Sequence, residues 1–103
     1  MTDKTNPQFL KMAIKSDLMR VAQSAGRLTN PESYDVWMTF LTKALENLHK
    51  LPPNDPALKV NDYLSSLFQP KEKVLYDAKS RLRWAEKVLD VSCMLGISDT
   101  LAS

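Results

Sequence analysis

Glycine is scarce in this sequence, with 2 residues among 103, while 6 residues are proline. An all-β fold needs many tight turns in which glycine supplies backbone angles that other residues avoid, so this count argues against such a fold. A glycine-rich loop that cradles phosphate is excluded too, because Gly26 and Gly96 each stand alone. The composition therefore favours helices.

Long hydrophobic runs are also lacking. No stretch approaches the roughly 18 consecutive apolar residues that a membrane span needs, and the N-terminal segment lacks the apolar region of a secretory signal. The single Cys93 cannot form an intramolecular disulfide, and its neighbours Val91, Met94 and Leu95 indicate a buried, inert thiol in a reducing compartment. We therefore expect a cytoplasmic protein that does not contact a membrane.

The excess of positive over negative charge is small. Lys and Arg number 14 and Asp and Glu 12, so the formal net charge is +2, too little to create a strong field by itself. Hydrophobic residues make up 44% and charged residues 25% of the chain, close to the averages for soluble globular domains. At 103 residues the chain is long enough for one domain with its own core.

Candidate catalytic groups are sparse. His49 is the single histidine and has no second His or Cys at a spacing suited to metal binding. A phosphoacceptor role in a histidine-phosphotransfer bundle is disfavoured, because Leu51-Pro52-Pro53 ends the helix soon after His49. We interpret His49 as a boundary residue favoured by the negative helix end. We expect no catalytic residue, no metal, no cofactor and no small-molecule substrate.

Four segments carry apolar residues at helical spacing, at about 7–27, 31–51, 56–68 and 70–95. Three of them begin with Asn or Asp followed by Pro, at residues 6, 30 and 55, where the side chain caps the first turn and Pro loses no needed donor. The fourth begins at Gln69-Pro70, which has the Pro but a poor cap. Gly96 marks a helix end, and residues 98–103 are expected to be a frayed tail.

These segments predict an all-α fold, an antiparallel four-helix up-down bundle with a short third helix. The whole chain, 1–103, is expected to form a single helical domain. Because the third helix is short, part of the first and fourth helices is left uncovered. We expect this uncovered part to include apolar residues.

Two helices carry more than one apolar stripe. The first has a main stripe from Leu10 to Leu28 and a second on nearly the opposite face, and the fourth has a heptad-like seam of Leu75, Ala78, Leu82, Ala85, Leu89 and Ser92 beside a second apolar row. Two stripes on one helix need two surfaces to pack against. The residues predicted to bind a partner are Phe9, Met12, Met19, Trp84, Val91 and Leu95.

Basic residues recur on one side of the fourth helix. Lys79, Arg83 and Lys87 are spaced by four, with Tyr76 on the same side, and the first helix adds further basic residues. Acidic residues interleave with this strip, so a solvated face bearing surface ion pairs such as Asp77–Arg81 is the simpler interpretation. The residues expected to contact phosphates or an acidic partner, should the strip bind one, are Lys11, Lys15, Tyr76, Lys79, Arg83 and Lys87.

The sequence thus leads to two hypotheses of different classes. The first is a small cytoplasmic interaction module, an adaptor, regulator or assembly subunit, that binds another protein or itself as a homodimer through the apolar stripes. The alternative is a nucleic-acid-associated helical subunit that lays the basic faces of the first and fourth helices along a phosphate backbone. No motif in the sequence identifies the partner.

Overall fold

The computed structural model describes residues 6–27 and 33–95, and within these ranges the fold is all-α, as predicted. The described elements are five α-helices and one 3₁₀-helix. Asn30-Pro31, Leu28, Gly96 and the expected tail lie outside the described residues.

The first helix, α1 (Pro7–Gly26), begins as its sequence predicts. The Asn6 side chain accepts hydrogen bonds from the backbone N–H groups of Gln8 and Phe9, at 2.8 and 3.3 Å. The predicted main stripe is buried wherever it is described: Leu10, Ile14, Leu18, Val21 and Ala25. These residues form the side of the core that α1 contributes.

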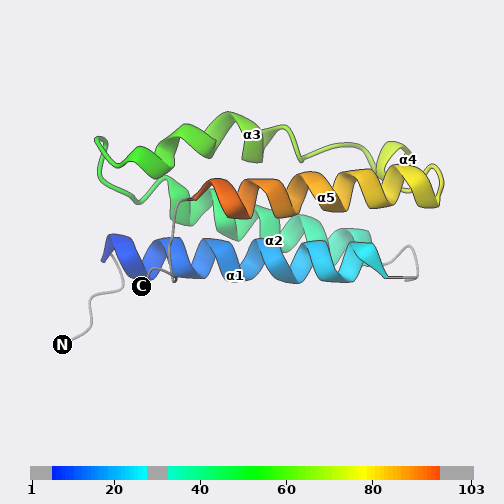
Figure 1. Ribbon diagram of the computed structural model, residues 1–103, viewed down its shortest axis with the longest axis horizontal. Coiled ribbons are helices and arrows are strands. Elements are labelled where there is room, and N and C mark those ends of the chain that lie inside the picture. Colours follow the sequence, from blue (N-terminus) through cyan, green and yellow to red (C-terminus); the bar gives the residue numbers. More distant parts are fainter. Residues whose placement is uncertain (1–5, 28–32, 96–103) are drawn as a thin grey trace.

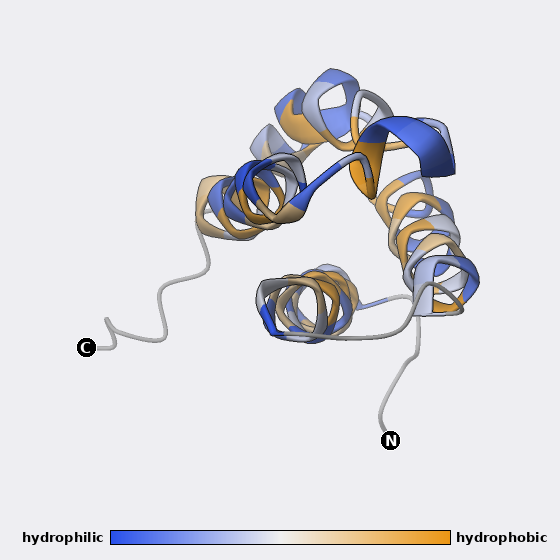
Figure 2. Ribbon diagram, turned by 90° about the vertical axis from the view of Figure 1, so that its right-hand side faces the viewer, coloured by the Kyte–Doolittle hydropathy of each residue, from blue (hydrophilic) through white to orange (hydrophobic). Residues whose placement is uncertain are grey.

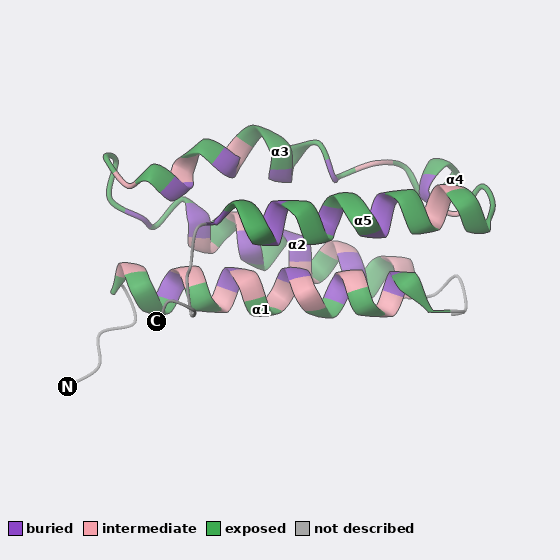
Figure 3. Ribbon diagram, in the orientation of Figure 1, coloured by how far each residue is buried: buried purple, intermediate pink, exposed green. Residues whose placement is uncertain are grey.

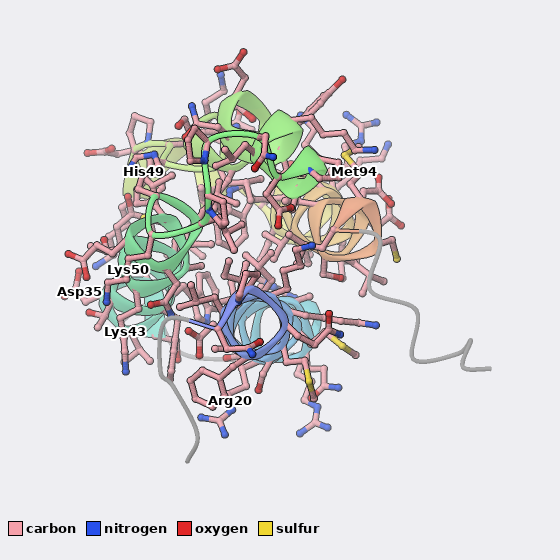
Figure 4. All side chains as sticks on the ribbon, turned by 90° about the vertical axis from the view of Figure 1, so that its left-hand side faces the viewer. Arg20, Asp35, Lys43, His49, Lys50 and Met94 are labelled. Atoms are coloured by element: carbon pink, nitrogen blue, oxygen red, sulfur yellow. The ribbon has the colours of Figure 1, made fainter. Side chains whose placement is uncertain are left out.

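The second helix, α2 (Ser33–Leu48), turns one apolar side inward. Trp37, Leu41, Ala44 and Leu48 are buried, and Tyr34, Met38, Phe40 and Leu45 pack against them in part. Its polar side faces out, where Asp35 and Lys43 project from the molecule, as does Lys50 just beyond the helix (Figure 4).

The third segment is shorter and more irregular than the single helix predicted over 56–68. It consists of a 3₁₀-helix, η1 (Pro56–Val60), followed by α3 (Asn61–Ser65). Asp55 caps η1 as expected, since its carboxylate accepts from the Ala57 N–H at 2.9 Å. After α3 the Ser66 hydroxyl donates to the Tyr63 carbonyl, a local bond that competes with continued helix.

The fourth segment corrects the predicted continuous helix over 70–95. A short α4 (Lys71–Val74) ends before residues 75–77, and α5 (Ala78–Met94) begins afresh. Asp77 makes the break: its backbone is extended, and its side chain accepts from the Ser80 N–H at 2.7 Å as an N-cap. The spacing of Asp77 and Arg81 in the sequence favoured an ion pair, and the cap made by Asp77 was not predicted.

The elements surround one core. Helix α1 lies between α2 and α5, running antiparallel to both, while η1 and α3 extend along the side of α2 and α5 away from α1 (Figures 1 and 2). Buried residues follow the inner side of each long helix (Figure 3). Helix α3 lies beside the C-terminal part of α5, and the segment leading to α4 runs along its N-terminal part, so α5 is covered unevenly along its length (Figure 1).

Candidate functional site

A groove of about 450 Å³ runs between α1 and α5 and is the largest hollow we describe. Its surface is mainly apolar, with two polar residues at the edges. The lining residues are Met19, Ala22, Gln23, Leu82, Ala85, Glu86 and Leu89. We call this the α1–α5 groove.

The groove exists because α5 has two apolar rows and buries one of them more fully. Trp84, Val88 and Val91 point into the core, whereas Leu82 and Leu89 in the neighbouring seam are 44% and 43% exposed. Both leucines belong to the heptad-like seam predicted from the sequence, on a helix that was expected to keep some apolar residues uncovered. Ala85, between them, is buried and is small enough to let another backbone approach closely.

The predicted partner-binding residues separate into two groups. Met19 lines the α1–α5 groove, and Phe9 and Met12 are exposed on α1, in agreement with a surface role. Trp84, Val91 and Leu95 are only 3–4% exposed and belong to the core, so their place on a partner surface is corrected. The row that we assigned to a partner faces α2 and α3 within the same chain.

The predicted basic residues do not form one strip. Lys11 is held in an ion pair with Asp55, with 3.0 Å between Nζ and the carboxylate, and Lys15 on the same helix is partly buried. Tyr76 is 79% exposed but lies in the break before α5, so it does not continue the helical row of Lys79, Arg83 and Lys87.

Arg83 and Lys87 lie on the flank of α5 that faces α4. Together with Lys73 they line a smaller hollow of about 140 Å³. Because the α1–α5 groove uses the other flank of α5, the basic faces of α1 and α5 are not combined. Sequence reasoning missed Lys73, since a continuous helix gave no reason to place it opposite Arg83.

Two carboxyl groups with a lowered pKa, Asp77 and Asp55, make hydrogen bonds within their own turns. Hydrogen bonds from the Ser80 backbone N–H and hydroxyl lower the pKa of Asp77. Burial raises the pKa of Asp55, but the Ala57 N–H and Lys11 outweigh it, so the pKa is lowered overall. Among the described residues, the predicted surface pairs Asp77–Arg81, Arg83–Glu86 and Lys87–Asp90 do not approach within 4.0 Å.

His49 and Cys93 are both exposed residues, in surroundings unlike those of a reactive centre. His49 is exposed just beyond α2, where its Nε2 lies 2.7 Å from the Asn61 side-chain oxygen (Figure 4). Cys93 is exposed, which corrects the expected burial. The buried position is instead Ser92, whose hydroxyl donates to the Leu89 carbonyl at 2.7 Å.

A further hollow, of about 310 Å³, lies between α3 and α5. Tyr63 and Met94 are at its exposed rim, and Met94 is on the opposite side of the molecule from Lys43 (Figure 4). Val91 lines this hollow while still being almost fully buried by its own chain.

Three comparisons were made, against protein-family models, curated proteins and solved structures, and none found a match. Among the described residues no group of three or more His, Cys, Asp or Glu side chains is placed to hold a metal ion. No helix in the described part of the chain has the length and apolar character to cross a membrane.

Proposed function

We propose that this protein is a small helical interaction module that receives an amphipathic helix of another protein in the α1–α5 groove. The observation that carries the proposal is the half-exposed pair Leu82 and Leu89 beside Met19. In a coiled coil, leucines seven residues apart on one helix pack against the partner helix, and Leu82 and Leu89 have this spacing.

The residues that line the groove indicate which kind of helix it would bind. Ala22 and Ala85 allow close approach, so the partner contributes large apolar side chains at helical spacing. Glu86 stands at the edge, and a Lys or Arg of the partner would be favoured opposite it. The proposed partner is therefore an amphipathic helix with an apolar stripe and a basic residue beside it.

A second copy of this chain fits less well. In a two-fold symmetric dimer the same patch meets itself. Pairing Leu82 of one copy with Leu89 of the other would bring the Glu86 side chains of both copies close to the symmetry axis. Like charges at that position disfavour the dimer, and the homodimer expected from the sequence stays a prediction.

We also propose an up-down arrangement of the helices and a cytoplasmic location. The course of the chain supports an antiparallel up-down bundle in which η1, α3 and the residues leading to α4 stand in for the third helix. The single cysteine, which rules out an intramolecular disulfide, supports the cytoplasmic location.

Nucleic-acid binding across α1 and α5 has weaker support. Lys11 is paired with Asp55, and Tyr76 lies off the helical row. The phosphate-contacting face predicted from the sequence would need both sets of basic residues on one surface. We therefore do not adopt it as the proposed function.

The experiment compares two charge insertions. Leu82→Asp places a charge in the groove, and Val36→Asp is the matched control, since Val36 is 52% exposed on α2 and Leu82 is 44% exposed. We expect a helical partner cross-linked through a photoreactive group at residue 23 to be lost from the groove variant and retained by the control. The isolated partner helix should then bind the native chain at least tenfold more tightly than the groove variant.

Two results would contradict the proposal. One is equal capture by both variants while circular dichroism shows that both are folded. The other is a stable dimer in sedimentation equilibrium that the groove variant dissociates, which would make a second copy the occupant.

A further inference from the structure

The small hollow between α4 and α5 gathers positive charge from two elements. Lys73 comes from α4, and Arg83 and Lys87 come from successive turns of α5. Gln69 and Ser80 add polar groups to the lining. Figure 2 shows that the short α4 is hydrophilic apart from one apolar edge turned toward the core.

The walls of this hollow are anchored to the core. The Trp84 indole N–H donates to the Leu67 carbonyl at 3.0 Å, and the Tyr34 hydroxyl donates to the Gln69 carbonyl at 2.5 Å. Val74 is almost fully buried. The chain on both sides of Lys73 is thus fixed against α5 and α2, so the position of its backbone relative to Arg83 is set by the fold.

The three cations have no carboxylate partner in the described part of the chain. No Asp or Glu oxygen there lies within 4.0 Å of Lys73, Arg83 or Lys87, in contrast to the 3.0 Å pair of Lys11 with Asp55. Glu86 and Asp90 stand one turn from Arg83 and Lys87 on α5 but lie beyond ion-pair distance. Asp77 interacts electrostatically with Arg83 and Lys79, but its carboxylate is engaged by Ser80.

Glu72, beside Lys73 in sequence, interacts electrostatically with Tyr34. Burial first, and then the charges of Glu72 and Asp35, raise the pKa of Tyr34. None of the described carboxylates lies within 4.0 Å of the three cations that line the hollow. An anion bound there would meet positive charge from two elements.

We propose that the α4–α5 hollow binds a phosphate monoester group, with Arg83 as a two-pronged donor and Lys73 and Lys87 as point charges. Three cations match a dianion better than a single carboxylate. The volume, about 140 Å³, is the smallest of the three hollows, so we assign to it only the phosphate group of the ligand.

Binding should follow the charge of the ligand. The second ionisation of a phosphate monoester has a pKa of about 6. Affinity should therefore rise between about pH 5 and pH 7.5 as the dianion forms. A rise that follows this ionisation would report the charge of the ligand.

The test is a titration with inorganic phosphate and with O-phosphoserine at constant ionic strength, followed by NMR shifts of the Trp84 indole N–H. Arg83→Gln and Lys87→Gln should each weaken binding at least tenfold. The control Lys59→Gln, a change at an exposed lysine of η1, should alter it less than twofold. Both phosphate sources should bind if the phosphate group alone is recognised, and O-phosphoserine alone if the ester is also read.

Three results would overturn the proposal. The first is no saturable shift at 10 mM of either probe, a concentration chosen on the order of the weakest useful affinity. The second is an equal loss of affinity in the Lys59→Gln control, which would indicate a diffuse field. The third is binding of a single-stranded oligonucleotide, lost in Arg83→Gln, with no response to either phosphate probe, which would make a phosphodiester backbone the ligand.

Discussion

Trp37 and Trp84 meet in the core near the C-terminal end of α1, with their ring centroids 5.5 Å apart and their planes inclined by 31°. Each indole N–H has an acceptor of its own. Trp37 donates to the Ser24 hydroxyl oxygen at 2.8 Å, and Trp84 donates to the Leu67 carbonyl at 3.0 Å. The pair therefore connects α1, α2, α5 and the segment after α3.

Replacing Trp84 tests this connection. Trp84→Phe removes the donor to Leu67 and should lower the free energy of unfolding by about 1–3 kcal/mol. Trp84→Ala also leaves a cavity and should cost about 3–5 kcal/mol. Urea denaturation followed by circular dichroism measures both. Tyr76→Phe, at an aromatic residue in water, should stay within about 0.5 kcal/mol, and a similar loss there would contradict a central role for Trp84.

The same substitution at two leucines distinguishes core from groove. Leu64 is fully buried, so Leu64→Ala should cost about 2–5 kcal/mol. Leu89 already has 43% of its surface in water, so Leu89→Ala should cost about 1 kcal/mol or less. Thermal or urea unfolding gives the comparison. Equal costs would mean that the α1–α5 groove is closed in solution.

The Lys11–Asp55 ion pair makes stability depend on pH. The folded pKa of Asp55 is lowered, so the pair stabilises the folded state above the unfolded pKa of about 3.9, and this contribution is lost as the pH falls through the folded value. Asp55→Asn keeps an oxygen for the Ala57 N–H but removes the charge. We expect a lower Tm than the native chain at pH 7 and a difference that narrows below about pH 4. Glu46→Gln, on the exposed face of α2, should show no comparable narrowing in calorimetry.

The pKa of Asp17 is shifted in the opposite direction to that of Asp55. Burial raises its pKa, although the charges of Lys43 and Arg20 act to lower it. Since the folded pKa is above the unfolded value, the protonated form favours the folded state, and that advantage is lost as the pH rises through the folded pKa. Asp17→Asn should therefore raise the Tm at pH 7 and have little effect near pH 3. A lower Tm at pH 7 would show that the attraction to Lys43 and Arg20 is the larger effect.

The exposure of Cys93 is directly measurable. A thiol reagent such as dithionitrobenzoate should label the native chain without denaturant, at a rate near that of the unfolded chain. Cys93→Ser should leave the Tm nearly unchanged, within about 0.5 kcal/mol in free energy, because the side chain is already in water. Labelling that requires denaturant would place the thiol back in the core.

The helices were predictable where their signals are local. Asn6 and Asp55 cap the elements that follow them because a short polar side chain reaches the free N–H groups of the next turn. The break at 75–77 was not found, because residues on both sides fit one helical pattern and the cap at Asp77 also has the spacing of an ion pair with Arg81.

The candidate site was predictable in part. Met19 was chosen from its position on the second stripe of α1, and it does line the α1–α5 groove. Trp84, Val91 and Leu95 were assigned to the same kind of surface and are core. Periodicity locates apolar rows on a helix but does not say which of two neighbouring rows another helix covers.

The sequence by itself determined that this chain is helical, where α1 and the third segment begin, and which sides of α1 and α2 face inward. These features follow from interactions within a few residues and from one dominant apolar stripe. The tertiary structure alone decided which row of α5 is buried, that Cys93 is exposed while Ser92 is not, and that Lys73 joins Arg83 and Lys87 around one hollow. Each of these depends on how α4, α3 and α1 approach α5, and contacts between segments so far apart in the chain are set by packing rather than by local pattern.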